Sequence, residues 1–247
     1  MSNFTLEVCV DSAESALAAV RGGATRLELC ANLVIGGTTP SLFLYREIRK
    51  VSDIPIHILI RPRFGDFCYT GSELSIIEQE VKQFKLEGAQ GVVIGVLKPD
   101  GTLDAAAMET LCRAADGLNI TLHRAFDMCR DPFETLGQAE RLGVTAILTS
   151  GQRNRCLDGA ELLRQLAEYG GIDIIAGSGV TAEVIRKLRV ITGVSSYHMS
   201  GKTAVDSIMT FRNPDLYMGL PSLSEYELWR TDENQIAAAR QVLEEIS

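Results

Sequence analysis

The sequence lacks the features that mark several common classes of protein. Its six cysteines contain no Cys-x-x-Cys pair, which argues against a zinc ribbon or a dense disulfide scaffold and favours a reducing cytoplasmic location. No apolar run reaches the roughly 18 residues of a membrane span, and Glu7 interrupts the apolar stretch that a signal peptide would need. No basic patch is visible and the net charge is −8, so we expect neither a nucleic-acid partner nor a membrane.

What the sequence has instead is a regular alternation of two kinds of segment. Short runs rich in Val, Ile and Leu occur eight times, at 4–10, 26–29, 55–60, 91–94, 119–123, 146–149, 172–176 and 195–199. Segments with helical periodicity follow them, at 12–21, 41–50, 72–86, from 105, and at 132–142, 160–169, 181–188 and 233–246. Eight such units predict an α/β fold in which residues 1–247 form a single (β/α)8 TIM barrel domain.

The stretch 201–231 does not follow this alternation. A connection longer than about 15 residues without structure of its own is uncommon unless it forms a lid or an interface. Its apolar residues, Phe211 and Trp229 among them, favour packing over a disordered linker. We therefore expect an irregular segment that covers the barrel or contacts another subunit.

Polar residues stand at the ends of most of the predicted strands. In a parallel barrel these ends meet at one face, where active sites lie. A carboxylate turned toward the outer helices would be buried without water, which costs several kcal/mol. Glu7 and Glu28 are therefore expected to point to the barrel axis, and the alternation of strand side chains takes Cys9 and Cys30 with them.

Cys9 and Cys30 are the candidate metal ligands. They end neighbouring strands, and two thiolates suit a soft monovalent ion such as Cu(I) in a near-linear site. The alternative is that both are small buried hydrophobes, since free cysteine is among the most buried residue types.

The catalytic candidates, if the chain is an enzyme, all lie at strand ends: Glu7, Glu28, Arg61, His123 and Asp127. In this interpretation Glu28 and His123 exchange protons while Arg61 holds an anion. The structural alternatives are an arginine–aspartate pair that stabilises the loop at 123–127, and a pair between Arg61 and Glu7 or Glu28 inside the barrel. With His198, the two glutamates and His123 also offer ligands for a divalent metal, although no Asp-x-His or His-x-His spacing supports that site.

Arginines after the third and fifth strands, and glycine-rich loops after the seventh and eighth, indicate anion binding. The candidates are Arg61, Arg63, Arg124, Gly177, Ser178, Gly179, Ser200 and Gly201. In this fold phosphate often lies on the loops after strands seven and eight, beside a helix N-terminus. The alternative is that these glycines serve tight turns alone.

Seven short motifs, which span nearly the whole chain in order, carry a family resemblance. They lie at 6–9, 26–30, 36–41, 60–63, 65–67, 123–127 and 148–151, and together they resemble the CutC family of copper-homeostasis proteins. The resemblance implies a cytoplasmic (β/α)8 barrel that forms homo-oligomers, in particular dimers, and binds Cu(I) at the cysteines that match Cys9 and Cys30. Phe64 stands where the family usually has glycine, and Ser178 interrupts what is often a triple glycine.

Two functional hypotheses follow. The first is a cytoplasmic Cu(I)-binding protein that takes part in copper homeostasis. The second is a TIM-barrel enzyme, an isomerase, lyase or hydrolase, that acts on a small anionic or phosphorylated substrate. A barrel that has lost an ancestral activity is the remaining alternative.

Overall fold

A ring of eight parallel strands forms the centre of the computed structural model, which describes residues 4–216, 218–220 and 222–246. The strands are β1 (Thr5–Val10), β2 (Arg26–Leu29), β3 (Ile56–Leu59), β4 (Gly91–Ile94), β5 (Asn119–Leu122), β6 (Ala146–Thr149), β7 (Asp173–Gly177) and β8 (Ser196–Met199). Each strand pairs with the next along the chain, and β8 pairs with β1 to close the ring. The predicted (β/α)8 barrel is therefore confirmed.

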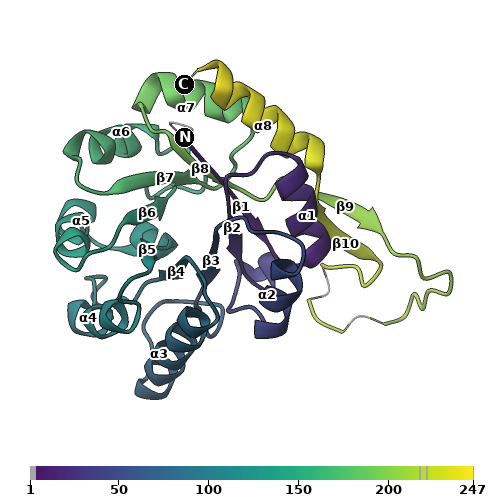
Figure 1. Ribbon diagram of the computed structural model, residues 1–247, viewed down its shortest axis with the longest axis horizontal. Helices are drawn as coiled ribbons and strands as arrows, with labels where there is room; N and C mark the ends of the chain where they lie inside the picture. The colour runs from purple at the N-terminus through teal and green to yellow at the C-terminus, as the bar shows by residue number, and fades with distance from the viewer. Residues whose placement is uncertain (1–3, 217, 221, 247) are drawn as a thin grey trace.

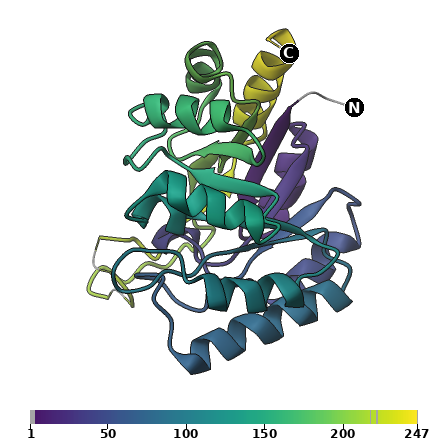
Figure 2. The same cartoon turned by 90° about the vertical axis from the view of Figure 1, so that its left-hand side faces the viewer.

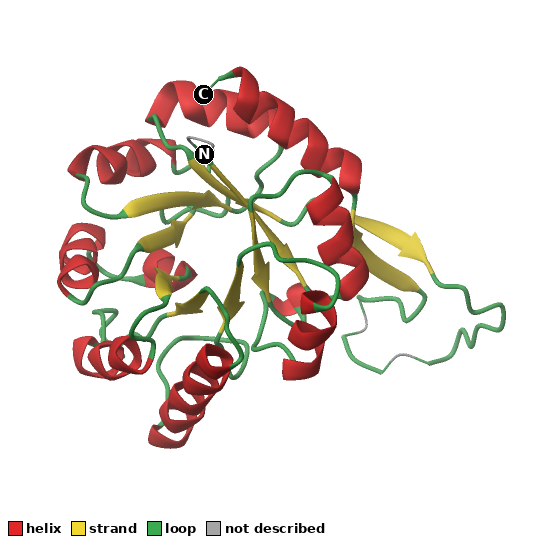
Figure 3. Cartoon of the chain, viewed as in Figure 1, coloured by secondary structure: helices red, strands yellow, loops and turns green. Residues whose placement is uncertain are grey.

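Helices surround the strands, as Figures 1 and 3 show. They are α1 (Ala13–Arg21), α2 (Leu42–Arg49), α3 (Gly71–Leu86), α4 (Ala105–Ala114), α5 (Pro132–Arg141), α6 (Ala160–Tyr169), α7 (Ala182–Thr192) and α8 (Glu233–Glu245). Two short 3-10 helices, η1 (Leu33–Ile35) and η2 (Arg124–Met128), lie in the loops after β2 and β5. No helix among the described residues combines the length and apolarity that crossing a bilayer requires.

Local sequence signals explain where several helices begin. Thr70 and Glu73 form a capping box at the start of α3, in which each side chain accepts a hydrogen bond from the other residue's backbone N–H. Asp131 accepts hydrogen bonds from two backbone N–H groups at the start of α5, where Pro132 occupies the first turn. These residues satisfy donors that an uncapped helix would leave without partners.

The side chains of each strand alternate between two apolar layers. Leu6, Val8 and Val10 belong to the large core between the strands and the helices. Two smaller clusters fill the inside of the ring, one around Cys30, Leu59 and Val93, and one made of Ala146, Leu148 and Ile175. Glu7, Cys9 and Glu28 therefore point inward, as the alternation predicts.

The stretch 201–231 was expected to be irregular, but its two ends pair with each other and form a two-stranded ribbon. Strands β9 (Lys202–Asp206) and β10 (Glu227–Thr231) pair antiparallel and project beside α1, with a long loop between them (Figures 1 and 2). The ribbon is joined to the barrel wall by the Thr231 backbone N–H, which donates to Ser15 Oγ at 3.1 Å. Most of its side chains are exposed, so the sequence of these two strands lacks the apolar pattern that predicts a buried strand.

Candidate functional site

A cavity of about 450 Å³ opens where the strands end. The side chains and glycines around it come from loops and strand ends distributed over the barrel. They are Cys9, Glu28, Leu33, Gly36, Gly37, Leu59, Arg61, Phe67, His123, Arg124, Leu148, Ser178, Gly179, Val180, His198, Met199, Ser200 and Lys202. The structure thus brings eight of the sequence-predicted site residues to one place: Cys9, Glu28, Arg61, His123, Arg124, Ser178, Gly179 and Ser200.

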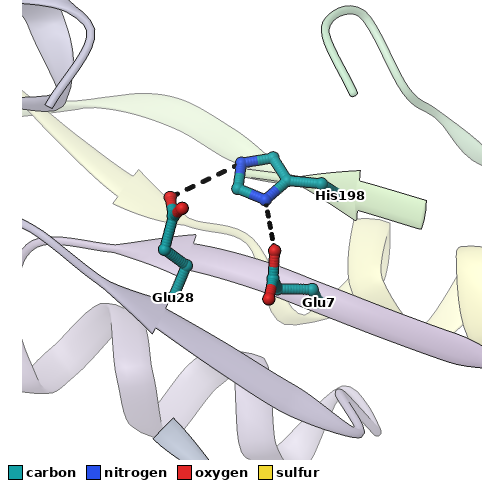
Figure 4. Close-up of side chains that lie close together, drawn as sticks. All are labelled: Glu7, Glu28 and His198. Atoms are coloured by element: carbon teal, nitrogen blue, oxygen red, sulfur yellow. Dashed lines mark hydrogen bonds and ion pairs between the residues drawn. The ribbon is translucent and has the colours of Figure 1, made fainter. Parts of the chain in front are cut away.

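Glu7 lies at the inner end of this group, fully buried, and is paired on both sides. Its Oε2 accepts a hydrogen bond from Arg26 Nε at 2.7 Å, and its Oε1 lies 2.8 Å from His198 Nδ1 (Figure 4). Burial alone raises the pKa of this carboxyl, but Arg26 and His198 together lower it well below its usual range. Glu7 is therefore a buried anion that holds Arg26 and His198 in position.

Glu28 faces the same imidazole from the neighbouring strand. Its Oε2 lies 3.8 Å from His198 Nε2 (Figure 4), and burial is the main cause that raises the pKa of Glu28 to about 7. One oxygen or nitrogen from each of Glu7, Glu28 and His198 lies within 4.8 Å of the other two, so the three offer ligand atoms to a cation. Glu28 is about half ionised at neutral pH, which suits a group that gives and takes protons.

The two candidate thiols lie beside this cluster and are buried. Cys9 pairs in register with Glu28 on β2, lines the cavity, and its Sγ donates to Met199 O at 3.6 Å. Cys30 lies behind Gly37, since a Cβ built on that glycine would be 3.9 Å from the Cys30 Sγ. Burial, followed by the charges of Cys9 and Glu28, raises the pKa of Cys30 well above its usual value. Cys9 lies in β1, and Cys30 directly follows β2, the strand that pairs with β1.

Arg61 does not form the ion pair with Glu7 or Glu28 that was the structural alternative to anion binding, so that alternative was wrong. Its guanidinium donates to the carbonyl oxygens of Gly36, Gly37 and Gly65, the last at 2.7 Å. No carboxylate of the described chain forms an ion pair with it, because the Glu7 oxygens are taken by Arg26 and His198. Arg61 lines the cavity on the wall that carries Phe67.

His123 is buried on the same wall and is neutral at physiological pH. Burial, and after it the charge of Arg61, lowers the pKa of this imidazole to about 3. Its Nδ1 accepts a hydrogen bond from the Ala125 backbone N–H at 3.2 Å, so the ring proton is on Nε2. His198, not His123, is therefore the imidazole that lies next to Glu28.

Asp127 holds the loop after β6 and does not line the cavity. Its carboxylate accepts hydrogen bonds from Thr149, Ser150 and Gln152, and pairs with Arg124 Nε at 2.7 Å. The arginine–aspartate pair proposed as a structural alternative thus exists in the structure. Arg124 itself lines the cavity.

Three further predicted residues also lie outside the cavity lining. Arg63 pairs with Glu73 at 2.6 Å and with Asp66 at 3.0 Å. Gly177 and Gly201 each adjoin a lining residue in sequence but do not line the cavity themselves. Phe64 is exposed and does not line the cavity, so it does not narrow it.

Sequence reasoning named His198 only as a possible ligand of a divalent metal and did not select Phe67, although both line the cavity. His198 carried a usable signal, because it stands near the end of the last barrel strand with the parity of Glu7. Phe67 lies in a loop, where alternation gives no direction. His57 is buried in the core, and burial is the main cause that lowers its pKa to about 4.

Comparison with known proteins now places the chain in a family. A model of the CutC family matches residues 4–203. The chain belongs to the CutC family. A CutC family protein from Histophilus somni (strain 2336) is 41% identical over 242 residues, which cover 97% of this chain and 99% of that protein.

Other CutC proteins extend this similarity. The copper homeostasis protein cutC homolog of Homo sapiens is 38% identical over 248 aligned residues, which cover 99% of this chain and 91% of that protein. The crystal structure of a CutC protein from Streptococcus agalactiae superimposes with a TM-score of 0.76 at 32% identity, and covers 80% of this chain and 98% of that one. CutC membership and the barrel fold thus agree with the sequence-based resemblance.

Proposed function

We propose that this chain binds Cu(I) through Cys9 and Cys30 and takes part in copper homeostasis in the cytoplasm. The observation that carries the proposal is the placement of two buried, neighbouring thiols at the ends of β1 and β2, one lining the cavity and one behind Gly37. The homologue from Homo sapiens, named as a copper homeostasis protein, supports the biological role. In this role copper is the cargo of the protein and not a resident cofactor.

The donor set suits a soft monovalent cation. Thiolate sulfur selects Cu(I) over hard cations, and two donors meet its preference for low coordination numbers. Glu28 and Asp11 add negative charge around Cys30, which raises the cost of an unpaired thiolate there and favours a bound cation. All six cysteines are free, as a reducing compartment requires.

Anaerobic Cu(I) titration against a chromophoric competitor tests the site. We expect Cys9→Ser and Cys30→Ser each to weaken binding by at least about 100-fold, because serine oxygen is a poor ligand for Cu(I). A serine hydroxyl can donate the hydrogen bond that each thiol donates, to Met199 O from position 9 and to Val10 O from position 30. The fold is therefore preserved. Cys112→Ser, at a half-buried site on α4 away from the cavity, is the matched control. Unchanged affinity in both cavity variants would rule out the proposed ligands.

A second candidate function is favoured by one observation: Glu28, with a pKa of about 7, lines a cavity of about 450 Å³ beside His198. A metal carrier does not need this volume, whereas an isomerase, lyase or hydrolase acting on a small anionic substrate does. A thermal-shift screen of sugar phosphates, followed by turnover assays on each hit, tests this function. Turnover that Glu28→Gln leaves intact would exclude Glu28 as the proton-transfer group.

We also propose that the β9–β10 ribbon and its loop pack against a second copy of the chain to form a homodimer. Ile208 is 98%, Phe211 76% and Met218 79% exposed in one chain, which is unfavourable for large apolar side chains gathered on one arm. A two-stranded ribbon is marginally stable by itself, so packing against a partner would stabilise it. The resemblance to CutC proteins supports a dimer. The alternative for this arm is a lid over the cavity, which Lys202 already lines.

A further inference from the structure

Arg61 is a buried cation without a carboxylate partner. It is only 8% exposed, and its guanidinium contacts three backbone carbonyl groups but no acidic side chain within the described residues. The neighbouring Tyr69 hydroxyl supplies no negative charge, because burial raises the pKa of Tyr69 to about 12. An opposite charge stabilises a buried charge more than the dipoles of uncharged groups do. The position is therefore suited to a bound anion.

The backbone carbonyls that Arg61 contacts occupy only part of the guanidinium, and its other close polar neighbour is the Tyr69 hydroxyl. Of its five N–H donors, the two on Nη1 go to Gly36 O and Gly37 O, and one on Nη2 goes to Gly65 O. The buried Nε has no partner among the described residues. An unused Nε–H and a remaining Nη2–H on adjacent nitrogens match two oxygens of a carboxylate or a phosphate.

His123 supplies a second donor without a partner. Its Nδ1 is occupied by the Ala125 N–H, and its Nε2, which carries the proton, is buried with no acceptor among the described residues. Gly95 makes the room for this ring, since a Cβ there would lie 2.6 Å from His123 Cε1. A neutral imidazole N–H that is held in place can donate to an oxygen without adding charge.

Phe67 joins the two donors into one wall. Its ring centroid lies 4.7 Å from that of His123 and 5.0 Å from Arg61 Cζ. Cys9 and Glu28 lie on β1 and β2, whereas Arg61 and His123 follow β3 and β5. The wall with the buried cation thus comes from other strands than Cys9 and Glu28.

We propose that the wall formed by Arg61, His123 and Phe67 binds the anionic group, a carboxylate or a phosphate monoester, of a small organic molecule that occupies the cavity. The volume of about 450 Å³ lies within the range of small-molecule sites. The proposal does not depend on the thiols as ligands, and it stands whether the chain binds copper or not.

Side-chain NMR of the histidines tests the proposal on the unaltered protein. The chain has three histidines, so their ring signals can be resolved and assigned. We expect inorganic phosphate or acetate to shift the Nε2 and Hε1 signals of His123 in a saturable way, while those of His57, buried in the barrel below, stay in place. A saturable shift with phosphate alone identifies a phosphate as the ligand group, and a saturable shift with acetate alone identifies a carboxylate. The absence of a saturable His123 shift with both anions would overturn the proposal.

A variant of Arg61 then tests the assignment directly. We expect Arg61→Lys to lower the affinity for the anion by at least about tenfold. Lysine lacks the planar pair of N–H donors of a guanidinium, so one charge-assisted hydrogen bond is lost. Arg46→Lys, on α2 and paired with Glu87, is the matched control and should bind as the wild type does. Equal binding by Arg61→Lys and the wild type would contradict the assignment.

Discussion

His198 and Glu7 form a 2.8 Å hydrogen bond across the line where the last barrel strand meets the first. Glu7 is fully buried, and its second oxygen is bound by Arg26 from β2. One carboxylate thus links three consecutive positions of the ring: β8, β1 and β2. The arrangement explains how a buried acid is tolerated inside a barrel, since each oxygen has a charged or chargeable donor.

Replacing this acid should destabilise the barrel. We expect Glu7→Gln to lower the free energy of unfolding by about 3 kcal/mol, because the half-buried Arg26 and His198 would lose their fully buried counter-charge. Urea denaturation at pH 7 measures the change. Glu109→Gln, exposed on α4, is the control and should differ from the wild type by less than about 0.5 kcal/mol. A Glu7→Gln protein as stable as this control would show that the interactions of Glu7 with Arg26 and His198 contribute nothing to stability.

Glu28 should make the protein less stable as the pH rises. Its pKa in the folded protein is about 7, above the ordinary value of 4.5, so the folded state binds this proton more tightly than the unfolded state does. The stability that results is complete below pH 4.5 and is lost as the pH rises to about 7, an effect of about 3 kcal/mol. Glu28→Gln should flatten this dependence between pH 5 and pH 8, as measured by denaturation at each pH. A slope identical to that of the wild type would assign the effect to other groups.

Copper affinity should rise steeply with pH. Both thiols must lose a proton before they bind Cu(I), and burial together with the charge of Cys9 raises the pKa of Cys30. We therefore expect an apparent affinity that increases by up to about 100-fold per pH unit between pH 6 and pH 8. Competition titrations across this range measure it. A flat profile would mean that the metal does not displace thiol protons.

Ser178 should tolerate glycine better than alanine. Its φ of 78° lies in the left-handed region, which explains why the family favours glycine here, and its Oγ donates to Asn154 O at 2.6 Å. Ser178→Ala loses this hydrogen bond and keeps the strain, so we expect a loss of about 1 kcal/mol. Ser178→Gly loses the bond but relieves about 1 kcal/mol of strain, so it should be near neutral. Urea denaturation that ranks alanine at or above glycine would contradict this account.

The ribbon arm should control the oligomeric state. We expect the double variant Ile208→Glu/Phe211→Glu to be monomeric by light scattering under conditions in which the wild type is dimeric, because charges in an apolar interface are costly. Leu86→Glu, at an 82% exposed position at the end of α3, is the control and should leave the dimer intact. A dimer that survives the double variant would place the interface elsewhere.

The sequence predicted the barrel well because the two periodicities that build it are local. The helix expected at 160–169 begins and ends at those residues, and the strands expected at 26–29, 91–94 and 146–149 match as well. Strand parity also predicted that Glu7, Cys9 and Glu28 share the interior. These inferences need only the alternation of side chains and the cost of a buried charge.

Partner choice could not be predicted in the same way. A pair between Arg61 and an interior glutamate was one of two alternatives for Arg61, yet Arg26 is in register with Glu7 on the adjacent strand and takes that carboxylate. The roles of His123 and His198 depend on which atoms surround each ring, and alternation does not give that information. The ribbon at 202–206 and 227–231 was missed because its side chains are mostly exposed and show no apolar pattern.

The pairing of β1 with β8 has a consequence for how the chain acquires its structure during synthesis. One edge of β1 finds its hydrogen-bonding partner only after residue 199 has left the ribosome, and α8 then packs near Gly22, where a Cβ would lie 2.6 Å from Ile236. Contacts between such distant parts of a chain form slowly, because a long loop must close first. Until then the nascent protein exposes an open strand edge, and this is the stage at which it is most exposed to misassembly.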